Sequence, residues 1–352
     1  MEEVTRGKAI SDLIRTNKKE LVENLKAKGP DEIHPQPWRQ VREWNRTAVM
    51  EFILLGFGNG PGCQMIPSVL FLVIYTVTVL GNTTLVLIIR VNSRLHTPMY
   101  FFLMNLSLLD LCFTSTIAPK SMASFLLGSK VISYNGCATQ FFLFCLFLTT
   151  EGFLLATMAY DRYTAICNPL LYPVTMSKWV CIQMVVGSYI CGCVNSMLQT
   201  GFTFMLHYCG CKEIDHFFCD GPPLNSLSCS DTYINNLVMF TLCGLIIAST
   251  ALIVLISYIY IISTVLRIRS AEGRHKAFST CTSHMLVVTL FSETTAFMYT
   301  QPTWLSSLYP RKAVSVFYTF VFPMLNPFIY SLRNKDVKEA LRRTMGHKSL
   351  TK

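Results

Sequence analysis

Two carboxylates interrupt long apolar stretches of this sequence. Asp110 and Glu151 each lie well inside a run of apolar residues, and Asn82 and Asn326 lie at similar depths in two other runs. Ionisable side chains inside a membrane segment are costly and therefore indicate function. Two carboxylates and two amides that face one interior could hold a small cation, for which sodium is the candidate. The alternative is that the four side chains only form hydrogen bonds between helices.

Hydrolysis inside a membrane is a second chemistry that paired acids permit. The Gly-x-Gly-Asp pattern of one class of intramembrane aspartyl protease is absent from the sequence. His284 has no obvious partner, and no serine–histidine pair lies at a depth that suits hydrolysis. We therefore expect no enzymatic activity.

A polar segment at 205–232 concentrates side chains that could bond to sulfur or to a metal. It contains Cys209, Cys211, Cys219, Cys229, His207 and His216, and Cys137 lies at the end of an apolar run. On the oxidising side of a membrane, five such cysteines would form two disulfides and leave one thiol over. A zinc site that includes the two histidines is the alternative.

The composition indicates what surrounds these residues. Of 352 residues, 51% are hydrophobic and 14% are charged, whereas an ordinary soluble domain carries about a quarter charged residues. The mean hydropathy is positive. These values exclude a disordered chain and indicate a chain surrounded largely by lipid. The formal net charge of +10 fits loops that face anionic membrane lipid better than it fits nucleic-acid binding.

Seven apolar segments are long enough to cross the hydrocarbon of a membrane as helices. They are 65–90, 98–127, 136–166, 179–204, 233–266, 277–300 and 313–332. The predicted fold class is an all-α membrane protein, with a seven-transmembrane helix bundle at 61–332 and a short amphipathic helix eight in the cytoplasmic tail at 333–352. Residues 1–60 form a charged, extracellular N-terminal segment that is expected to be largely disordered, although 10–27 could form a short helix.

Basic residues indicate which ends of the helices face the cytoplasm. The first, third and fifth links and the tail contain fifteen lysines and arginines, whereas the other three links contain four. The C-terminus is therefore expected in the cytoplasm and the N-terminus outside. The sequon Asn45-Arg46-Thr47 would then be available for glycosylation at Asn45.

Five motifs give the sequence a specific resemblance. Asp161-Arg162-Tyr163 lies within MAYDRYTAICNPLLY at 158–172, and the other motifs are LHTPMYFFL at 95–103, SY at 257–258, KAFSTCTSH at 276–284 and PMLNPFIY at 323–330. In this order they resemble the signature motifs of odorant receptors, the olfactory branch of rhodopsin-like (class A) G-protein-coupled receptors. The resemblance covers about residues 45–345.

The resemblance implies a set of activation and G-protein-coupling residues, which are Asp161, Arg162, Tyr163, Tyr258, Asn326, Pro327 and Tyr330. Arg162 would pair with Asp161 at rest and turn toward the G protein on activation. Tyr258 and Tyr330 would move inward to hold the active state. Pro327 would weaken the hydrogen bonds of the seventh helix so that its end can bend.

The resemblance also implies how the cysteines pair. Cys137 would bond to Cys219 and Cys209 to Cys229. Cys211 would be left as a free thiol or as an alternative partner for Cys209. Asn45 fits the short glycosylated N-terminus of the family, whereas residues 1–44 have no counterpart in it.

The ligand site implied by the resemblance is the outer half of the bundle. Its expected lining is Phe144, Cys145, Leu148, Thr149, Leu242, Ile246, Ser292, Thr295, Ala296, Tyr299 and Thr319. This lining is apolar with a few hydroxyls. It suits a small volatile molecule that is held by burial, at about 25 cal/mol per Å² of apolar area.

One position departs from the family pattern. Phe291-Ser292-Glu293 stands where the family usually has Phe-Tyr-Gly. One hypothesis is that Glu293 faces the pocket and favours amines, and the alternative is that it is protonated and faces a neighbouring helix. The same change could disable normal activation.

The sequence as a whole predicts a plasma-membrane odorant receptor. The resemblance implies that it activates a stimulatory (olfactory) heterotrimeric G protein and raises cyclic AMP. The alternatives are the same receptor acting as a chemosensor outside the olfactory epithelium, and a receptor that does not signal because of Ser292-Glu293. Membrane lipid is an expected partner, nucleic acid is not, and no cofactor is expected besides sodium as an allosteric ion.

Overall fold

The computed structural model describes residues 50–57, 61–209, 212–267, 270–300, 311–333 and 337–342. Residues 1–44, the sequon at Asn45 and Cys211 lie outside these ranges. Within the helices, no side chain is described at 61–66, 271–273, 275–280, 283, 298–300, 311 and 331–333.

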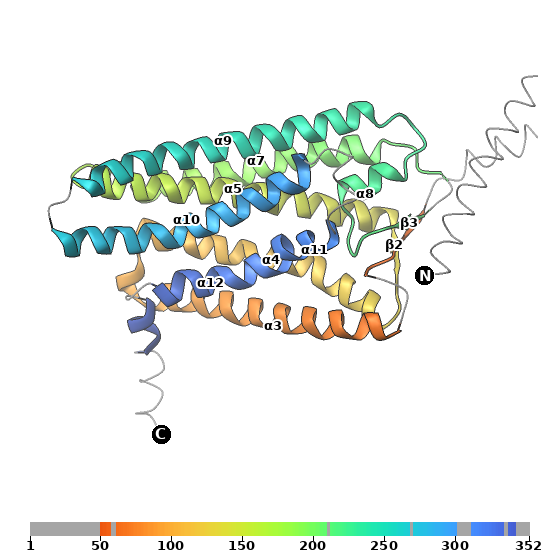
Figure 1. Cartoon of the computed structure of the whole chain (residues 1–352), viewed down its shortest axis with the longest axis horizontal. Helices are drawn as coiled ribbons and strands as arrows, with labels where there is room; N and C mark the ends of the chain where they lie inside the picture. Colours follow the sequence, from red (N-terminus) through yellow and green to blue (C-terminus); the bar gives the residue numbers. More distant parts are fainter. Residues whose placement is uncertain are drawn as a thin grey trace, which may run out of the picture. The chain divides into compact units, whose positions relative to one another are not determined.

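Seven long helical segments form a bundle within the described residues, as Figure 1 shows. They are α3 (Pro61–Val91), α4 (Pro98–Leu126), α5 (Tyr134–Cys167), α7 (Lys178–Phe204), α9 (Tyr233–Leu266), α10 (Ala271–Thr300) and a last segment composed of α11 (Arg311–Val316), the π-helical turn η2 (Phe317–Val321) and α12 (Phe322–Arg333). Each segment coincides with one of the seven predicted spans, so the predicted seven-helix fold is confirmed.

The outer surfaces of these helices are apolar. Six of the seven segments, as far as they are described, are long and apolar enough to cross a membrane. The seventh, α10, has 30 residues, but its first turns are polar and basic. On α9, Leu245, Leu252 and Leu255 expose more than half of their surface. Leucines that are exposed in this way along a helix fit a hydrocarbon environment.

Local sequence explains where several helices begin. The Ser133 hydroxyl accepts a hydrogen bond from Gly136 N at 3.1 Å and caps α5. Ser177 occupies the same position before α7. Pro98 occupies the first turn of α4, where the missing N–H of proline costs nothing.

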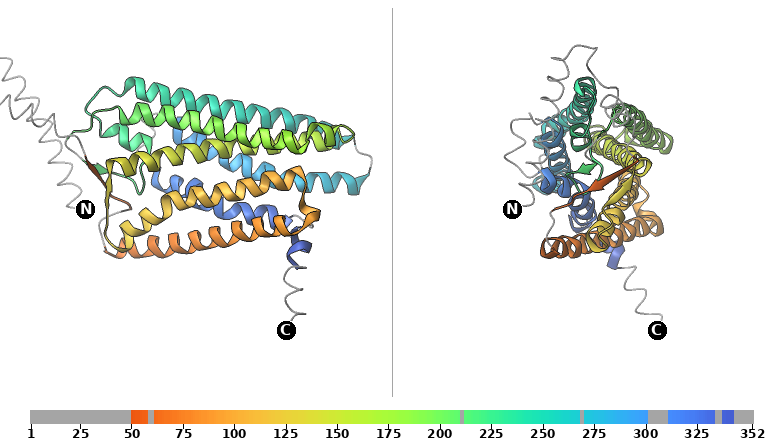
Figure 2. Two further views of the ribbon diagram at one scale, coloured as in Figure 1. Left: turned by 180° about the vertical axis from the view of Figure 1, so that it is seen from behind. Right: turned by 90° about the vertical axis from the view of Figure 1, so that its right-hand side faces the viewer.

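The helix α5 is the central element of the bundle. It packs against α4, α7, α9 and α10, and it runs among these neighbours in the end-on view of Figure 2. Buried residues form two hydrophobic clusters, and α5 contributes to both. Phe144 belongs to the cluster near the strands, and Leu155 belongs to the cluster at the other end.

A small three-stranded sheet lies at one end of the bundle (Figure 1). The strand β1 (Glu51–Leu54) is central, pairing antiparallel with β2 (Val131–Ser133) and parallel with β3 (Glu213–Ile214). Phe52 and Leu54 of β1 are completely buried. Residues 51–54 are therefore an ordered part of the segment 1–60, because this strand contributes apolar side chains and backbone hydrogen bonds to the sheet.

Short elements complete the described chain. They are η1 (Ser93–Leu95), α6 (Tyr172–Thr175), α8 (Gly221–Ser226) and a helical turn at 337–342. The last of these lies at the end of the bundle opposite the sheet (Figure 1). Its Val337 and Ala340 are buried, as expected for the apolar face of an amphipathic helix eight.

We expect opposite effects from alanine at two glycines of α7. A Cβ at Gly192 would lie 2.8 Å from the Leu146 carbonyl oxygen of α5, whereas a Cβ at Gly187 would meet no atom within 4 Å. Gly192→Ala should therefore destabilise the fold by about 1–3 kcal/mol through overpacking. Gly187→Ala should be neutral or stabilising by up to about 1 kcal/mol, because alanine favours helix. Thermal unfolding of the purified protein would measure both, and equal effects would contradict close packing of α5 on α7.

Candidate ligand cavity and activation site

A cavity lies between α5, α7, α9 and α10. It contains about 470 Å³ of space not filled by atoms, part of it open to the surroundings. The lining is Phe144, Cys145, Leu148, Thr149, Gly152, Asn195, Gln199, Cys243, Ile246, Ile247, Thr250, Phe291 and Thr295. Most of these side chains are apolar, so burial would supply most of the binding free energy of a ligand.

The polar side chains of the cavity form a short network between three helices. Asn195 Nδ2 donates to Thr149 Oγ1 at 2.8 Å and so joins α7 to α5. Gln199 Nε2 donates to Asn195 Oδ1 at 3.1 Å and to Cys243 Sγ at 3.4 Å, which joins α7 to α9. Sequence reasoning did not identify Asn195 or Gln199 as site residues. The available signal was an amide inside an apolar segment, the same signal that identified Asn82.

Six of the expected ligand residues line this cavity, and four do not. Phe144, Cys145, Leu148, Thr149, Ile246 and Thr295 line it, whereas Leu242, Ser292, Ala296 and Thr319 do not. On α9 and α10 the expected positions stand one residue from the lining residues Cys243, Phe291 and Thr295, a rotation of about 100° around the helix. Thr319 is completely buried in the π-helical turn, where its hydroxyl donates to Ser315 O at 2.7 Å. The Tyr299 side chain lies outside the described residues.

The hypothesis that Glu293 faces the pocket is wrong. Glu293 is exposed and does not line the cavity. It follows the lining residue Phe291 by two positions, about 200° around the helix, and therefore points away from the cavity. Its exposure also argues against the alternative, in which Glu293 is protonated and faces a neighbouring helix. Because Glu293 does not face the cavity, the structure gives no support to the predicted preference for amines.

A loop closes the bundle end beside the cavity. Phe217 and Phe218 of this loop are almost completely buried, and the Phe218 ring lies 5.1 Å from the ring of the cavity residue Phe144. Lys312 Nζ of α11 lies 2.5 Å from Asp215 Oδ1 and donates to Gly56 O at 2.8 Å. One lysine thus ties the loop, α11 and the chain after β1 together.

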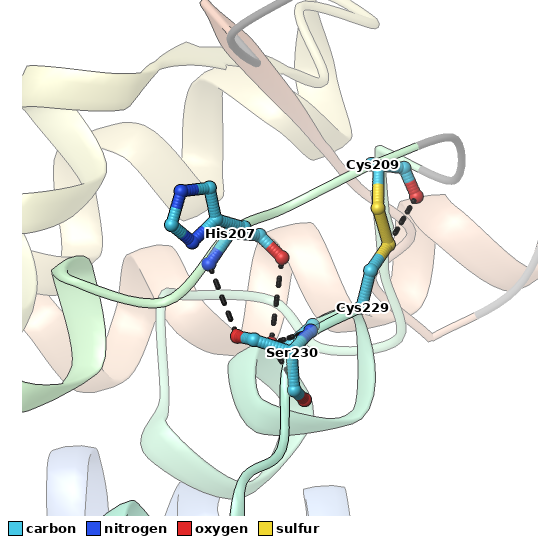
Figure 3. The surroundings of a disulfide bond; sticks show 5 residues. His207, Cys209, Cys229 and Ser230 are labelled. Atoms are coloured by element: carbon cyan, nitrogen blue, oxygen red, sulfur yellow. Dashed lines mark hydrogen bonds between the residues drawn. A yellow bond between two sulfur atoms is a disulfide. The ribbon is translucent and has the colours of Figure 1, made fainter. Parts of the chain in front are cut away.

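Both expected disulfides hold this loop. Cys137–Cys219 joins the start of α5 to the loop, and Cys209–Cys229 lies within the loop. Figure 3 shows the second bridge beside His207 and Ser230, where His207 N donates to Ser230 Oγ at 3.3 Å. The alternative of a zinc site loses its ligands, because these four cysteines are in disulfides. The described residues contain no cluster of three His, Cys, Asp or Glu side chains that could hold a metal.

The loop histidine His216 is buried against the last helical segment. Its Nε2 lies 3.1 Å from Ser315 Oγ, and its Nδ1 has no partner among the described residues. Burial and the nearby ammonium of Lys312 lower the pKa of His216 from its ordinary value of 6.5 to about 3. His216 is therefore neutral at physiological pH.

A polar layer joins four helices in the middle of the bundle. Asn326 Nδ2 of α12 donates to Asp110 Oδ2 of α4 at 2.9 Å. Asn82 Nδ2 of α3 donates to Pro323 O at 2.9 Å. Glu151 of α5 interacts with both Asp110 and Asn326. Asp110 Oδ1, Glu151 Oε2 and Asn82 Oδ1 are buried without a hydrogen-bond partner among the described residues, so three oxygens remain that could bind a cation.

The end of α5 holds the expected ion pair. Arg162 Nε donates to Asp161 Oδ2 at 3.0 Å, and a second guanidinium nitrogen forms an ion pair with the same carboxylate. Tyr172 of α6 donates its hydroxyl to Asp161 Oδ1 at 2.8 Å. Both oxygens of Asp161 are therefore engaged, which keeps Arg162 turned toward its neighbour.

Tyr258 has a partner that sequence reasoning did not find. Its hydroxyl lies 2.7 Å from His284 Nδ1, so a hydrogen bond joins α9 to α10. The statement that His284 lacks a partner is therefore wrong. The Tyr330 hydroxyl is buried with no partner among the described residues, and it interacts electrostatically with Asp110, Glu151 and Tyr258.

The fold and the sequence both match known receptors. The crystal structure of squid rhodopsin aligns with a TM-score of 0.63 and 18% identity, covering 83% of this chain and 88% of that chain. The bundle therefore has the rhodopsin fold.

A family model described as "Olfactory receptor" matches residues 71–348. Olfactory receptor OR9H1 of Homo sapiens is 58% identical over 306 residues, which cover 87% of this chain and 99% of that protein.

A second relative gives the same result. Olfactory receptor 9S13 of Mus musculus is 56% identical over 301 residues, which cover 86% of this chain and 90% of that protein. The chain belongs to the olfactory receptor family. It is an odorant receptor and a multi-pass membrane protein, not an enzyme, and its partners are a small-molecule ligand and a G protein.

The neutral state of His216 predicts a pH-dependent stability. Between pH 6.5 and about 3, the unfolded chain binds a proton that the folded chain does not. The contribution of His216 is therefore fully present above pH 6.5 and is lost as the pH falls, by up to about 1.4 kcal/mol per pH unit. His216→Asn should flatten the pH dependence of thermal unfolding. His207→Asn, which changes an exposed histidine of the same loop, should not, and the opposite pattern would contradict burial of His216.

Proposed function

We propose that an odorant in the cavity between α5, α7, α9 and α10 moves α10, and that the receptor then activates a stimulatory (olfactory) G protein to raise cyclic AMP. The observation that carries this proposal is the position of α10. Phe291 and Thr295 line the cavity, and His284, two helical turns earlier, holds Tyr258. A ligand that displaces Phe291 would therefore strain the bond between α9 and α10.

The proposed switch ends at Arg162. At rest, Asp161 binds Arg162 and Tyr172 at the end of α5. Outward movement of α10 would open space beside this ion pair, and Arg162 would turn from Asp161 into that space to meet the G protein. Tyr258, freed from His284, and the unpartnered Tyr330 hydroxyl would move inward and hold the open state. Pro327, next to Asn326 in α12, would let this end of the helix bend.

We further propose that the end of the bundle with Arg162 faces the cytoplasm, with the C-terminus, and that the sheet and the N-terminus face outside. The distribution of lysines and arginines supports this orientation, with fifteen on one side and four on the other. Basic loops on the cytoplasmic side would also contact anionic lipid.

Sodium is the proposed allosteric ion of the polar layer. The fit rests on the three unpartnered oxygens of Asp110, Glu151 and Asn82, because buried oxygens without a donor are the ligands that a small hard cation prefers. A bound cation would also relieve repulsion between the two carboxylates. Asn326, which already binds Asp110, would keep the layer closed around the ion in the resting state.

The signalling proposal predicts that Arg162→Ala abolishes odorant-evoked cyclic AMP. The assay uses cells that express the receptor with a stimulatory G protein and are exposed to a broad odorant panel. Arg90→Ala, an exposed arginine at the end of α3, is the matched control and should keep the response. Surface display of each variant is measured in the same cells. A response that survives Arg162→Ala at normal display would overturn the proposed switch.

The sodium proposal predicts a stabilisation that depends on Asp110. Sodium should raise the unfolding temperature of the purified receptor above its value in choline, with a gain of about 1.4 kcal/mol when sodium is tenfold above its dissociation constant. Asp110→Asn should remove the gain, whereas Asp231→Asn, at an exposed loop position, should not. An equal sodium effect in Asp110→Asn, or none in the unmodified receptor, would show that the layer binds no sodium.

A further inference from the structure

Two amide side chains of α7 face the cavity from a helix that otherwise presents many apolar residues to its surroundings. Asn195 and Gln199 are 93% and 96% buried, with exposures of 7% and 4%. They stand four residues apart and therefore lie on one face of the helix. Their position inside an apolar segment is costly unless the amides are bonded, so the bonds that they form and leave open determine what the cavity accepts.

The hydrogen bonds of Gln199 within the protein leave it able to act toward a ligand only as an acceptor. Its Nε2 donates to Asn195 Oδ1 and to Cys243 Sγ, which uses both N–H groups of the amide. Its Oε1 has no hydrogen-bond partner among the described residues. With the nitrogen bonded on two sides, Gln199 Oε1 is the atom of this amide that is left to accept a hydrogen bond from a ligand.

Donors lie beside this acceptor. Asn195 Nδ2 donates one proton to Thr149 Oγ1, and no acceptor for its second proton is found in the described part of the chain. The Thr149 hydroxyl accepts that bond, and its own proton likewise has no described acceptor. The cavity therefore offers one open acceptor and adjacent donors, a pattern that a hydroxyl group complements because it donates one hydrogen bond and accepts another.

The charge of the lining selects against ions. None of the described residues that line the cavity carries a charge. Asp220 acts electrostatically on the lining residues Cys145 and Cys243. It does not line the cavity, and it accepts a hydrogen bond from Gly221 N at 2.8 Å that caps α8. An ammonium or carboxylate ligand would lose its hydration without gaining a counter-charge.

We propose that the ligands of this receptor are small neutral alcohols or phenols whose hydroxyl donates to Gln199 Oε1 and accepts from Asn195 or Thr149. The hydrocarbon part of the ligand would pack on Phe144, Leu148, Ile246, Ile247 and Phe291. This inference rests on the proposed function of the cavity as the odorant site. A ketone or methyl ether with the same skeleton cannot donate to Gln199, and an amine or acid would be charged.

The experiment compares ligands that differ in one functional group. Purified receptor in lipid nanodiscs is unfolded thermally with menthol or menthone, with thymol or its methyl ether, and with octanol, octanal, octylamine or octanoate. On at least one skeleton the alcohol should bind about tenfold more tightly than its partner without a hydroxyl, the size expected for one buried hydrogen bond. Gln199→Met should abolish this preference. Gln183→Met, at an exposed glutamine of the same helix, should preserve it.

Other results would overturn the inference. These are equal binding of the alcohols and their partners, stronger binding of the amine or the acid, binding by none of the alcohols, or a preference that survives Gln199→Met. Cyclic AMP measured with the same compounds separates this inference from the proposed function. Signalling without a preference for alcohols supports the proposed function and rejects the ligand class. Alcohol-selective binding without a cyclic AMP response supports the ligand class and rejects the proposed function.

Discussion

Polar side chains in a bundle surrounded by hydrocarbon must find their hydrogen-bond partners within the protein, because lipid tails offer none. This constraint decides how the helices are joined. Asn326 binds Asp110 and so links α12 to α4, Tyr258 binds His284 and links α9 to α10, and Asn195 links α7 to α5. Apolar contacts alone would not hold the helices in one register, since side chains can pack equally well on lipid. The polar links therefore specify the arrangement that the apolar surfaces permit.

The central helix α5 connects the cavity, the polar layer and the ion pair, because it carries residues of all three. It carries cavity residues such as Phe144, then Glu151 of the polar layer, and finally the Asp161–Arg162 pair. The disulfide of Cys137 anchors its first turn to the loop beside the cavity. One helix thus contributes to all three sites. In the proposed activation, movement of α10 against α5 would change the cavity and the ion-pair region together.

The sequence predicted the helices well because the length of an apolar segment can be read from consecutive residues alone. The bounds of α9 agree with the predicted segment 233–266, and both disulfides agree with the family pattern. The sheet was not predicted, because strands of two to four residues carry no readable alternation. The cavity was predicted in part. Rotating α9 or α10 about its own axis by about 100°, the angle of one residue, changes which side chain points into the cavity. That rotation depends on how the helices pack against one another, which composition does not reveal.

Among the described residues, buried polar atoms without a hydrogen-bond partner mark the places where an ion or a ligand could still form a bond. Of eight such buried side-chain atoms, four belong to Asn82, Asp110, Glu151 and Tyr330 in or beside the polar layer. The Asp161–Arg162 pair, in contrast, uses both carboxylate oxygens. An unpartnered buried oxygen costs about 1–3 kcal/mol. An ion or ligand that supplies partners to these atoms would therefore stabilise the arrangement of helices that binds it.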